Sequence, residues 1–194
     1  NANELAFYYT PWVLYIGLIT LVLATFGVLS SKELKTQISY LVLLSVSIIL
    51  IAIGINSKEA LSGAIFYMIH STFVAGGFFL LADVILKARN STSLRPKMPI
   101  FKNAILIGSI FFIFAIAIAG LPPFSGFFGK IMILKSSINH TQTALILTTV
   151  LLSSLLVIVS LARSGTNIFY DTRTNEEVSY FKLSRATLSS FFYL

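Results

Sequence analysis

One stretch decides how this chain must fold, and it reads Gly120-Leu121-Pro122-Pro123-Phe124-Ser125-Gly126-Phe127-Phe128-Gly129-Lys130. Its prolines and glycines interrupt any helix that enters it. Apolar sequence of membrane type lies on both sides, so Lys130 sits in the middle of a hydrophobic region. A lysine at the centre of a bilayer costs about 3 kcal/mol or more, and such residues commonly face a bundle interior and mark ion paths. Broken helices are a common device of transporters. The stretch therefore predicts a discontinuous helix in an ion-translocating membrane protein.

The composition is that of an integral membrane protein. Of 194 residues, 56% are hydrophobic and 11% are charged, and the mean hydropathy is +0.89. A soluble domain carries about 25% charged residues. The chain has no cysteine, which excludes disulfides and thiolate-bound metals. Its net charge of +7 lies in loops between apolar spans, where basic residues set topology, so we expect no nucleic-acid partner.

Apolar runs of about 20 residues predict an all-α, polytopic transmembrane bundle with about five crossings. The expected spans cover residues 11–29, 34–55, 60–85, 104–138 and 143–162, and the fourth is broken at the proline pair. Residues 1–163 would form this bundle, and residues 164–194 an interfacial segment leading to a further span. Because the chain starts without methionine and ends in an apolar run, we expect a piece of a larger protein.

The region 104–138 could form two short spans or one broken crossing, and loop charge favours the second. With one crossing, one side of the membrane carries eleven Lys and Arg residues and the other carries two. With two crossings the division becomes eight against five. The positive-inside rule favours the stronger bias. It places the loops at 30–35 and 87–102 and the C-terminal tail in the cytoplasm, with Asn1 outside.

Lys130 and His70 are the main candidates for chemistry. Burial disfavours the charged form of a lysine, so Lys130 could load and release a proton. The alternative is a lysine that snorkels to the interface, but Lys135 is better placed to do so. His70 lies near the middle of its span, and histidine titrates near physiological pH. A proton relay and a structural hydrogen bond to a neighbouring helix are equally good interpretations of His70.

The break itself has a predicted local structure. Gly120, Gly126 and Gly129 allow irregular dihedral angles and close approach of neighbouring backbone. Pro123 suits the first turn of the second half-helix, where its missing N–H would be unpaired anyway. The carbonyl groups freed by the break must be satisfied by protein or water, since lipid offers no donor. We therefore expect the break to line a polar cavity.

Other polar residues have structural interpretations. Asp83 and Lys87 are spaced as an i, i+4 ion pair at the end of the third span. Lys35 and Arg163 are expected to be interfacial residues that set topology. Hydroxyl groups inside helices commonly bond to their own backbone, and this is expected for Ser45, Ser47, Ser71 and Thr72.

Three motifs, in the same order along the chain, resemble one known family. One is the broken-helix stretch at 120–130, another is Glu33-Leu34-Lys35-Thr36-Gln37-Ile38-Ser39-Tyr40, and the last is Phe66-Tyr67-Met68-Ile69-His70-Ser71-Thr72. They are similar to motifs of the antiporter-like subunits, which comprise the proton-pumping membrane subunits of respiratory complex I and the large subunits of Mrp-type multisubunit cation/proton antiporters. The match covers almost the whole chain.

The resemblance implies a role for each motif. The chain would be the C-terminal portion of a repeat-built protein of roughly fourteen helices, and its five crossings would be the ninth to thirteenth. Lys130 matches the terminal group of the family's central hydrophilic axis, and His70 matches the axis histidine. Lys35 matches a basic position at the start of a helix. The arginine that follows it in the family is replaced by Thr36.

Within the family, the details are most similar to the D subunits of the Mrp antiporters. This rests on His70-Ser71-Thr72, on Phe79-Leu80-Leu81-Ala82-Asp83 and on Ser160-Leu161-Ala162-Arg163-Ser164-Gly165. Some complex I relatives carry a lysine where this chain has Val74, and some carry a histidine where it has Ile48.

The resemblance therefore implies a subunit of a multisubunit Na⁺/H⁺ antiporter in a bacterial-type cell membrane. It would be an ion transporter and not an enzyme, and it would need no cofactor or metal. It would pack beside other membrane subunits in the lipid bilayer, and protons and Na⁺ would move through the complex. One alternative is a proton-pumping subunit of complex I or of a membrane-bound hydrogenase. Another is a structural scaffold, in which Lys130 only pairs with a neighbouring group.

Overall fold

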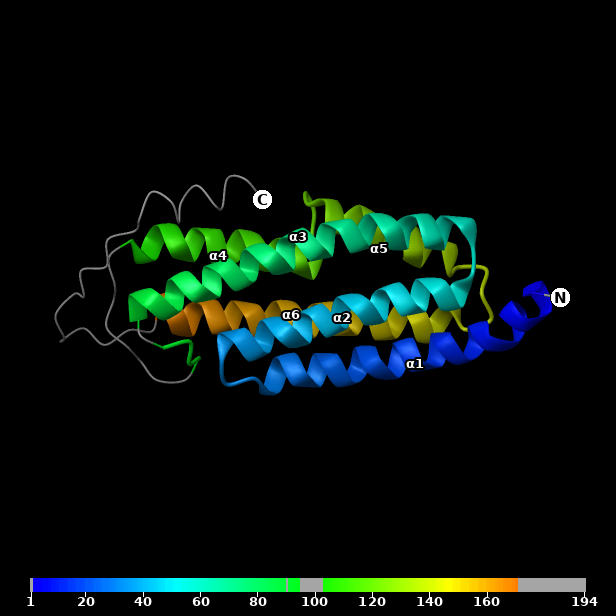
Figure 1. Cartoon of the computed structure of the whole chain (residues 1–194), viewed down its shortest axis with the longest axis horizontal. Helices are drawn as coiled ribbons and strands as arrows, with labels where there is room; N and C mark the ends of the chain where they lie inside the picture. The colour runs from blue at the N-terminus through cyan, green and yellow to red at the C-terminus, as the bar shows by residue number, and fades with distance from the viewer. Residues whose placement is uncertain (1, 90, 95–102, 171–194) are drawn as a thin grey trace.

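The computed structural model describes residues 2–89, 91–94 and 103–170, and within these ranges the chain is helical without strands. Figure 1 shows the helices as one elongated bundle. The helices are α1 (Ala2–Ser30), α2 (Leu34–Ile55), α3 (Lys58–Arg89), α4 (Ala104–Ala119), α5 (Ser125–Ser136) and α6 (Thr143–Phe169).

Five crossings account for the described helices, as the sequence predicts. α1, α2, α3 and α6 are each long and apolar enough to span a membrane. α4 is shorter, with 16 residues, and α5 has 12. Figure 1 shows α4 and α5 end to end along α3, and α3 packs against both. The two half-helices together therefore make one interrupted crossing.

The ends of α1, α3 and α6 meet at one end of the bundle. The backbone N–H of Leu34 donates to Thr92 O at 2.9 Å, and that of Leu94 donates to Lys32 O at 2.9 Å. The Asn167 side chain at the end of α6 donates to Leu94 O at 3.2 Å. The turn after α1, the segment after α3 and the end of α6 thus lie together, which is the arrangement that a single broken crossing requires. That this end faces the cytoplasm remains a prediction.

α3 lies at the centre and packs against α2, α4 and α5, while α6 packs against α1 and α4. Small residues bring the backbones together, as is common between membrane helices. A methyl group on Gly54 of α2 would meet the Leu14 backbone of α1 at 2.7 Å. A methyl group on Gly129 of α5 would meet the Tyr67 Cα of α3 at 3.1 Å. The Gly54 contact holds α2 against α1, and the Gly129 contact holds α5 against α3 at Tyr67.

Several helix ends differ from the predicted spans. α1 begins at Ala2 and holds Pro11 inside it, although the span was expected to start at residue 11. α3 continues to Arg89, and α6 continues to Phe169 into the segment expected to be interfacial. Apolar runs mark the part of a helix inside hydrocarbon, whereas the hydrogen-bond ladder continues into more polar flanks. The rest of that segment and the further span lie outside the described residues.

Candidate functional site

The end of α4 is a Schellman motif built on Gly120. Gly120 has φ 74°, in the left-handed region that favours glycine. Its N–H donates to Ala117 O at 3.1 Å, and the N–H of Leu121 donates to Ile116 O at 3.2 Å. This motif stops α4 at Ala119, whose carbonyl faces the bundle without a partner from its own helix.

The proline pair lies in the connection and not in a helix. α5 begins at Ser125, with Phe124 as its N-cap in an extended conformation. The prediction that Pro123 occupies the first turn of the second half-helix is therefore wrong. Residues 121–124 instead form a turn outside the helix, in which the N–H of Phe124 donates to Leu121 O at 3.2 Å, because the residue before a proline is driven away from helical angles.

Lys130 reaches back across the break from α5. Its side chain is buried, with 6% of its surface exposed. The ammonium donates to Ala119 O at 2.7 Å and to Ser154 Oγ of α6 at 3.2 Å. A hydrogen bond from a charged donor contributes about 1.5–3 kcal/mol, and here it satisfies a carbonyl that α4 leaves free. The prediction of a buried Lys130 beside the break is confirmed, and snorkelling to the interface is not what the structure shows.

His70 meets the same helix end from α3. Its Nε2 lies 3.0 Å from Ala117 O, and its Nδ1 lies 2.7 Å from Ser125 Oγ. A carbonyl oxygen can only accept, so Nε2 carries a proton. The serine hydroxyl can donate to a neutral Nδ1 or accept from a protonated one. His70 can therefore change charge while keeping both hydrogen bonds.

One small cavity beside the break is lined by apolar residues, and the expected polar cavity stays a prediction. A cavity of about 80 Å³ touches Ala119 and Leu121, and its lining is apolar throughout. Protein side chains satisfy the carbonyls of Ala117 and Ala119, so these groups need no water.

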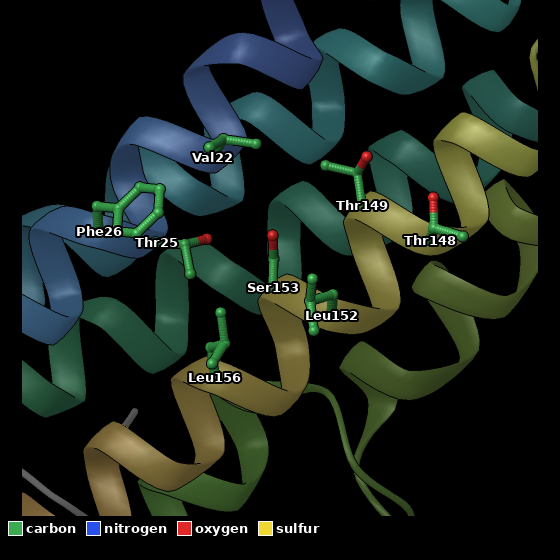
Figure 2. Close-up of a pocket in the computed structure, with 8 residues that line it drawn as sticks. All are labelled: Val22, Thr25, Phe26, Thr148, Thr149, Leu152, Ser153 and Leu156. Atoms are coloured by element: carbon green, nitrogen blue, oxygen red, sulfur yellow. The ribbon is translucent and has the colours of Figure 1, made fainter.

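A larger hollow of about 200 Å³ lies between α1 and α6, with Thr25 and Ser153 among the residues around it. Figure 2 shows this hollow, which neither Lys130 nor His70 lines.

Lys35 lies elsewhere. Its ammonium is 3.9 Å from the Asp83 carboxylate, which also pairs with Lys87 at 2.8 Å. The sequence predicted the i, i+4 ion pair of Asp83 and Lys87, but it did not predict that Lys35 joins this pair. These side chains are about half exposed. Asp83 is thirteen residues beyond His70 on α3, which is about 20 Å along a helix. The structure thus brings Lys130 and His70 to one helix end and leaves Lys35 far along the bundle.

The predicted hydroxyl groups bond to their own helices. Ser45 donates to Leu41 O and Ser47 to Leu44 O, while Ser71 and Thr72 both donate to Met68 O. These serines and this threonine are satisfied within their own helices, as expected.

Sequence reasoning missed three neighbours of the site, which are Ser125, Ser154 and Tyr67. Ser154 and Ser125 each provide a hydroxyl to one of the two titratable side chains. The ring of Tyr67 lies 5.9 Å from the Lys130 ammonium. Ser125 stands inside the quoted stretch, so its place at the start of a half-helix was the available signal. Ser154 and Tyr67 belong to other helices, and nothing in the sequence pairs them with Lys130.

Comparison with known proteins gives consistent matches. The family model described as NADH:quinone oxidoreductase/Mrp antiporter, transmembrane, matches residues 4–156. The D subunit of the Na(+)/H(+) antiporter of Bacillus subtilis (strain 168) is 29% identical over 158 residues, which is 81% of this chain and 32% of that protein. A Staphylococcus aureus (strain N315) protein named as the putative antiporter subunit mnhD2 is 29% identical over 176 residues, covering 89% and 34%. The chain thus spans about a third of the curated relatives it matches.

Solved structures share the fold. A chain of the membrane-bound sulfane sulfur reductase, an archaeal respiratory membrane complex, superposes with a TM-score of 0.81 at 20% identity over 96% of this chain and 38% of that chain. A chain of the Mrp complex from Dietzia sp. DQ12-45-1b gives a TM-score of 0.73 at 23% identity, covering 86% and 32%. The arrangement of the helices, including the broken crossing, is therefore that of a known architecture.

Proposed function

This chain belongs to the NADH:quinone oxidoreductase/Mrp antiporter family of transmembrane proteins, and we propose that it forms a proton-conducting part of a multisubunit Na⁺/H⁺ antiporter. The two relatives compared above are named as antiporter subunits, one of them for Na⁺ and H⁺. We take the proposed ions, Na⁺ and H⁺, from those names, and we place the proposed proton site at the broken crossing.

One observation carries the proposal, which is the buried Lys130 amine at the helix break. Its partners are a backbone carbonyl and a serine hydroxyl, and among the described residues it forms no salt bridge with a carboxylate. A charge held only by neutral partners in a low-dielectric interior is easily neutralised, because little compensates for its lost hydration. Lys130 would then hold a proton at Nζ and give it up when a nearby group gains charge.

His70 would pass the proton on. It contacts Ala117 of the same helix end whose Ala119 holds Lys130, and its hydrogen bonds survive a change of charge. Lys35 stays a proposed contributor at the far end of the path, by its match to the family motif. The distance along α3 means that other groups or water must connect it to His70.

The protein is a multi-pass membrane protein, and we assign it to the cell membrane by analogy with the bacterial relatives. Its partners would be other membrane subunits of the same antiporter, as expected of a protein whose structural relatives come from membrane complexes. Protons and Na⁺ would be the transported species.

The test is Lys130→Ala in the complete antiporter. We expect Na⁺-dependent proton exchange in everted vesicles to be lost while the complex still assembles, because alanine cannot hold a proton. Lys135→Ala is the matched control, since Lys135 is an exposed lysine of the same helix, and it should retain exchange. Normal exchange in Lys130→Ala would refute the proposal. Loss of assembly would instead support the scaffold interpretation.

The redox alternative has a separate test. A proton-pumping subunit of complex I or of a membrane-bound hydrogenase would purify together with flavin or iron–sulfur proteins. The sulfane sulfur reductase superposition is compatible with this alternative, although at 20% identity it establishes the fold alone. An optical spectrum of the purified complex distinguishes the two, because a secondary antiporter shows no bound flavin absorbance.

A further inference from the structure

We propose that Tyr67 is a positioning residue for Lys130, holding the ammonium against its ring face and binding a water at its buried hydroxyl beside Ser45. This inference rests on the proposed role of Lys130. It adds a residue that provides no direct hydrogen bond to the amine and to which the sequence analysis assigns no role, although Tyr67 stands in the motif at 66–72.

The ring of Tyr67 is placed for a cation–π contact. The Lys130 ammonium lies 5.9 Å from the ring centroid, within the range of about 6 Å at which a cation is attracted to an aromatic face. Tyr67 is 1% exposed and Lys130 is 6% exposed, so water screens the contact little. Cation–π contacts are strongest in such desolvated sites. The ring therefore favours the charged form of a lysine that is otherwise surrounded by neutral groups.

The backbone holds this geometry in place. Gly129 precedes Lys130, and a methyl group there would lie 3.1 Å from the Tyr67 Cα. The two helices are thus in direct backbone contact one residue away from the amine. Because α3 and α5 are in contact at this point, the side chain of Lys130 packs next to the ring of Tyr67.

The hydroxyl of Tyr67 is the unexplained feature that points to a ligand. It is buried and makes no hydrogen bond among the described residues. Ser45 of α2 lies within reach of it, and because the Ser45 hydroxyl donates to Leu41 O of its own helix at 3.1 Å, only its oxygen remains available, as an acceptor. Buried polar groups without partners are rare, and such a group commonly marks a bound water. A water that accepts from the Tyr67 hydroxyl and donates to the Ser45 oxygen would satisfy the Tyr67 hydroxyl and extend the polar path from the Lys130 site toward α2.

The groups that face Lys130 are few. Its titratable neighbours are Tyr67 and His70, both from α3, since α4 provides the Ala119 carbonyl and α6 provides the Ser154 hydroxyl. In the described ranges no carboxylate is paired with it. The ring of Tyr67 therefore adds to the Ala119 carbonyl in favouring the charged amine over the neutral one.

The experiment compares Tyr67→Leu and Tyr67→Phe in the full antiporter complex, with exchange measured against pH in everted vesicles. Leucine removes the ring, so the pH of half-maximal exchange should fall by about one unit, the size of a desolvated cation–π contact. Phenylalanine keeps the ring, so this midpoint should not move. The rate should instead fall about tenfold, because the water site is lost.

Phe78→Leu is the control for packing alone. Phe78 is as buried as Tyr67 on the same helix, and its ring packs against Phe111 at 5.2 Å between centroids. This variant should leave the midpoint unchanged. A wild-type midpoint in Tyr67→Leu, or equal shifts in Tyr67→Leu and Tyr67→Phe, would overturn the ring's role. A wild-type rate in Tyr67→Phe would overturn the water site. Lys130→Ala distinguishes the proposed role of Lys130 in exchange from the positioning role of Tyr67. If Lys130→Ala abolishes exchange while the Tyr67 variants behave as wild type, only the positioning role fails.

Discussion

At the residue scale, the hydroxyl of Ser125 decides whether His70 can change charge inside the bundle. It lies 2.7 Å from Nδ1 and can reverse its direction as the ring gains or loses a proton. Without it, a protonated Nδ1 on this half-buried ring would lose its hydrogen-bond partner, at a cost of about 1 kcal/mol. Ser125 thus contributes to proton transfer without holding a proton itself.

Ser125→Ala should therefore slow exchange about tenfold, which corresponds to about 1.4 kcal/mol in the protonated state of His70. The initial rate of Na⁺-dependent proton exchange in everted vesicles measures this. Ser136→Ala is the control, because the Ser136 hydroxyl donates to Ile133 O of its own helix and contacts neither titratable group. Equal rates in the two variants would mean that the Ser125 hydroxyl has no part in transfer.

The two central residues of the site could be predicted, and their partners could not. Lys130 stands out in sequence because a charge in an apolar run has to be buried or explained. Tyr67 stands in the motif at 66–72 and Ser154 in an apolar run, and neither position marks its residue as a neighbour of Lys130. They become neighbours of Lys130 only through the packing of α3, α5 and α6, which depends on contacts across the whole bundle.

At the scale of the elements, the broken crossing depends on the left-handed conformation of Gly120. A side chain at φ 74° costs about 1–2 kcal/mol. A methyl group there would also lie 2.8 Å from the Lys130 Cδ. Gly120→Ala should therefore lower the thermal stability of the purified protein and reduce exchange by displacing Lys130.

Gly108→Ala in α4 is the matched control for that change. Gly108 lies inside a regular helix, where alanine is favoured over glycine by about 1 kcal/mol, and its nearest neighbour would be the Phe169 ring at 3.2 Å. We expect this variant to keep its stability and its exchange. Two variants with the same melting temperature would show that the conformation of Gly120 is not what holds the break.

The elements illustrate what sequence patterns can and cannot determine. Apolar length and loop charge predicted the number of crossings and the place of the break. The sequence did not locate the start of α5, because the prolines at 122 and 123 are compatible both with a first helical turn and with a turn outside the helix. The structure settles this through Phe124, whose extended backbone caps the helix.

At the scale of the whole molecule, the two ends of the bundle hold different connections between helices. Lys32 and the segment 91–94 meet at one end, with Arg163 exposed nearby on α6. At the opposite end, a methyl group on Gly63 near the start of α3 would lie 2.9 Å from Met132 of α5. The α2–α3 and α5–α6 connections therefore share one side, and this sidedness follows only if α4 and α5 make a single crossing.

Single cysteines can report this arrangement directly, because the chain contains none of its own. Glu33→Cys, Glu59→Cys and Asn139→Cys are suitable positions, since all three side chains are exposed and none is a basic residue that sets topology. In intact cells, a membrane-impermeant maleimide should label Glu59→Cys and Asn139→Cys. Glu33→Cys should react only in everted vesicles. If α4 and α5 crossed the membrane separately, Asn139→Cys would instead label together with Glu33→Cys, and the Lys130 break could not lie at the middle of one crossing.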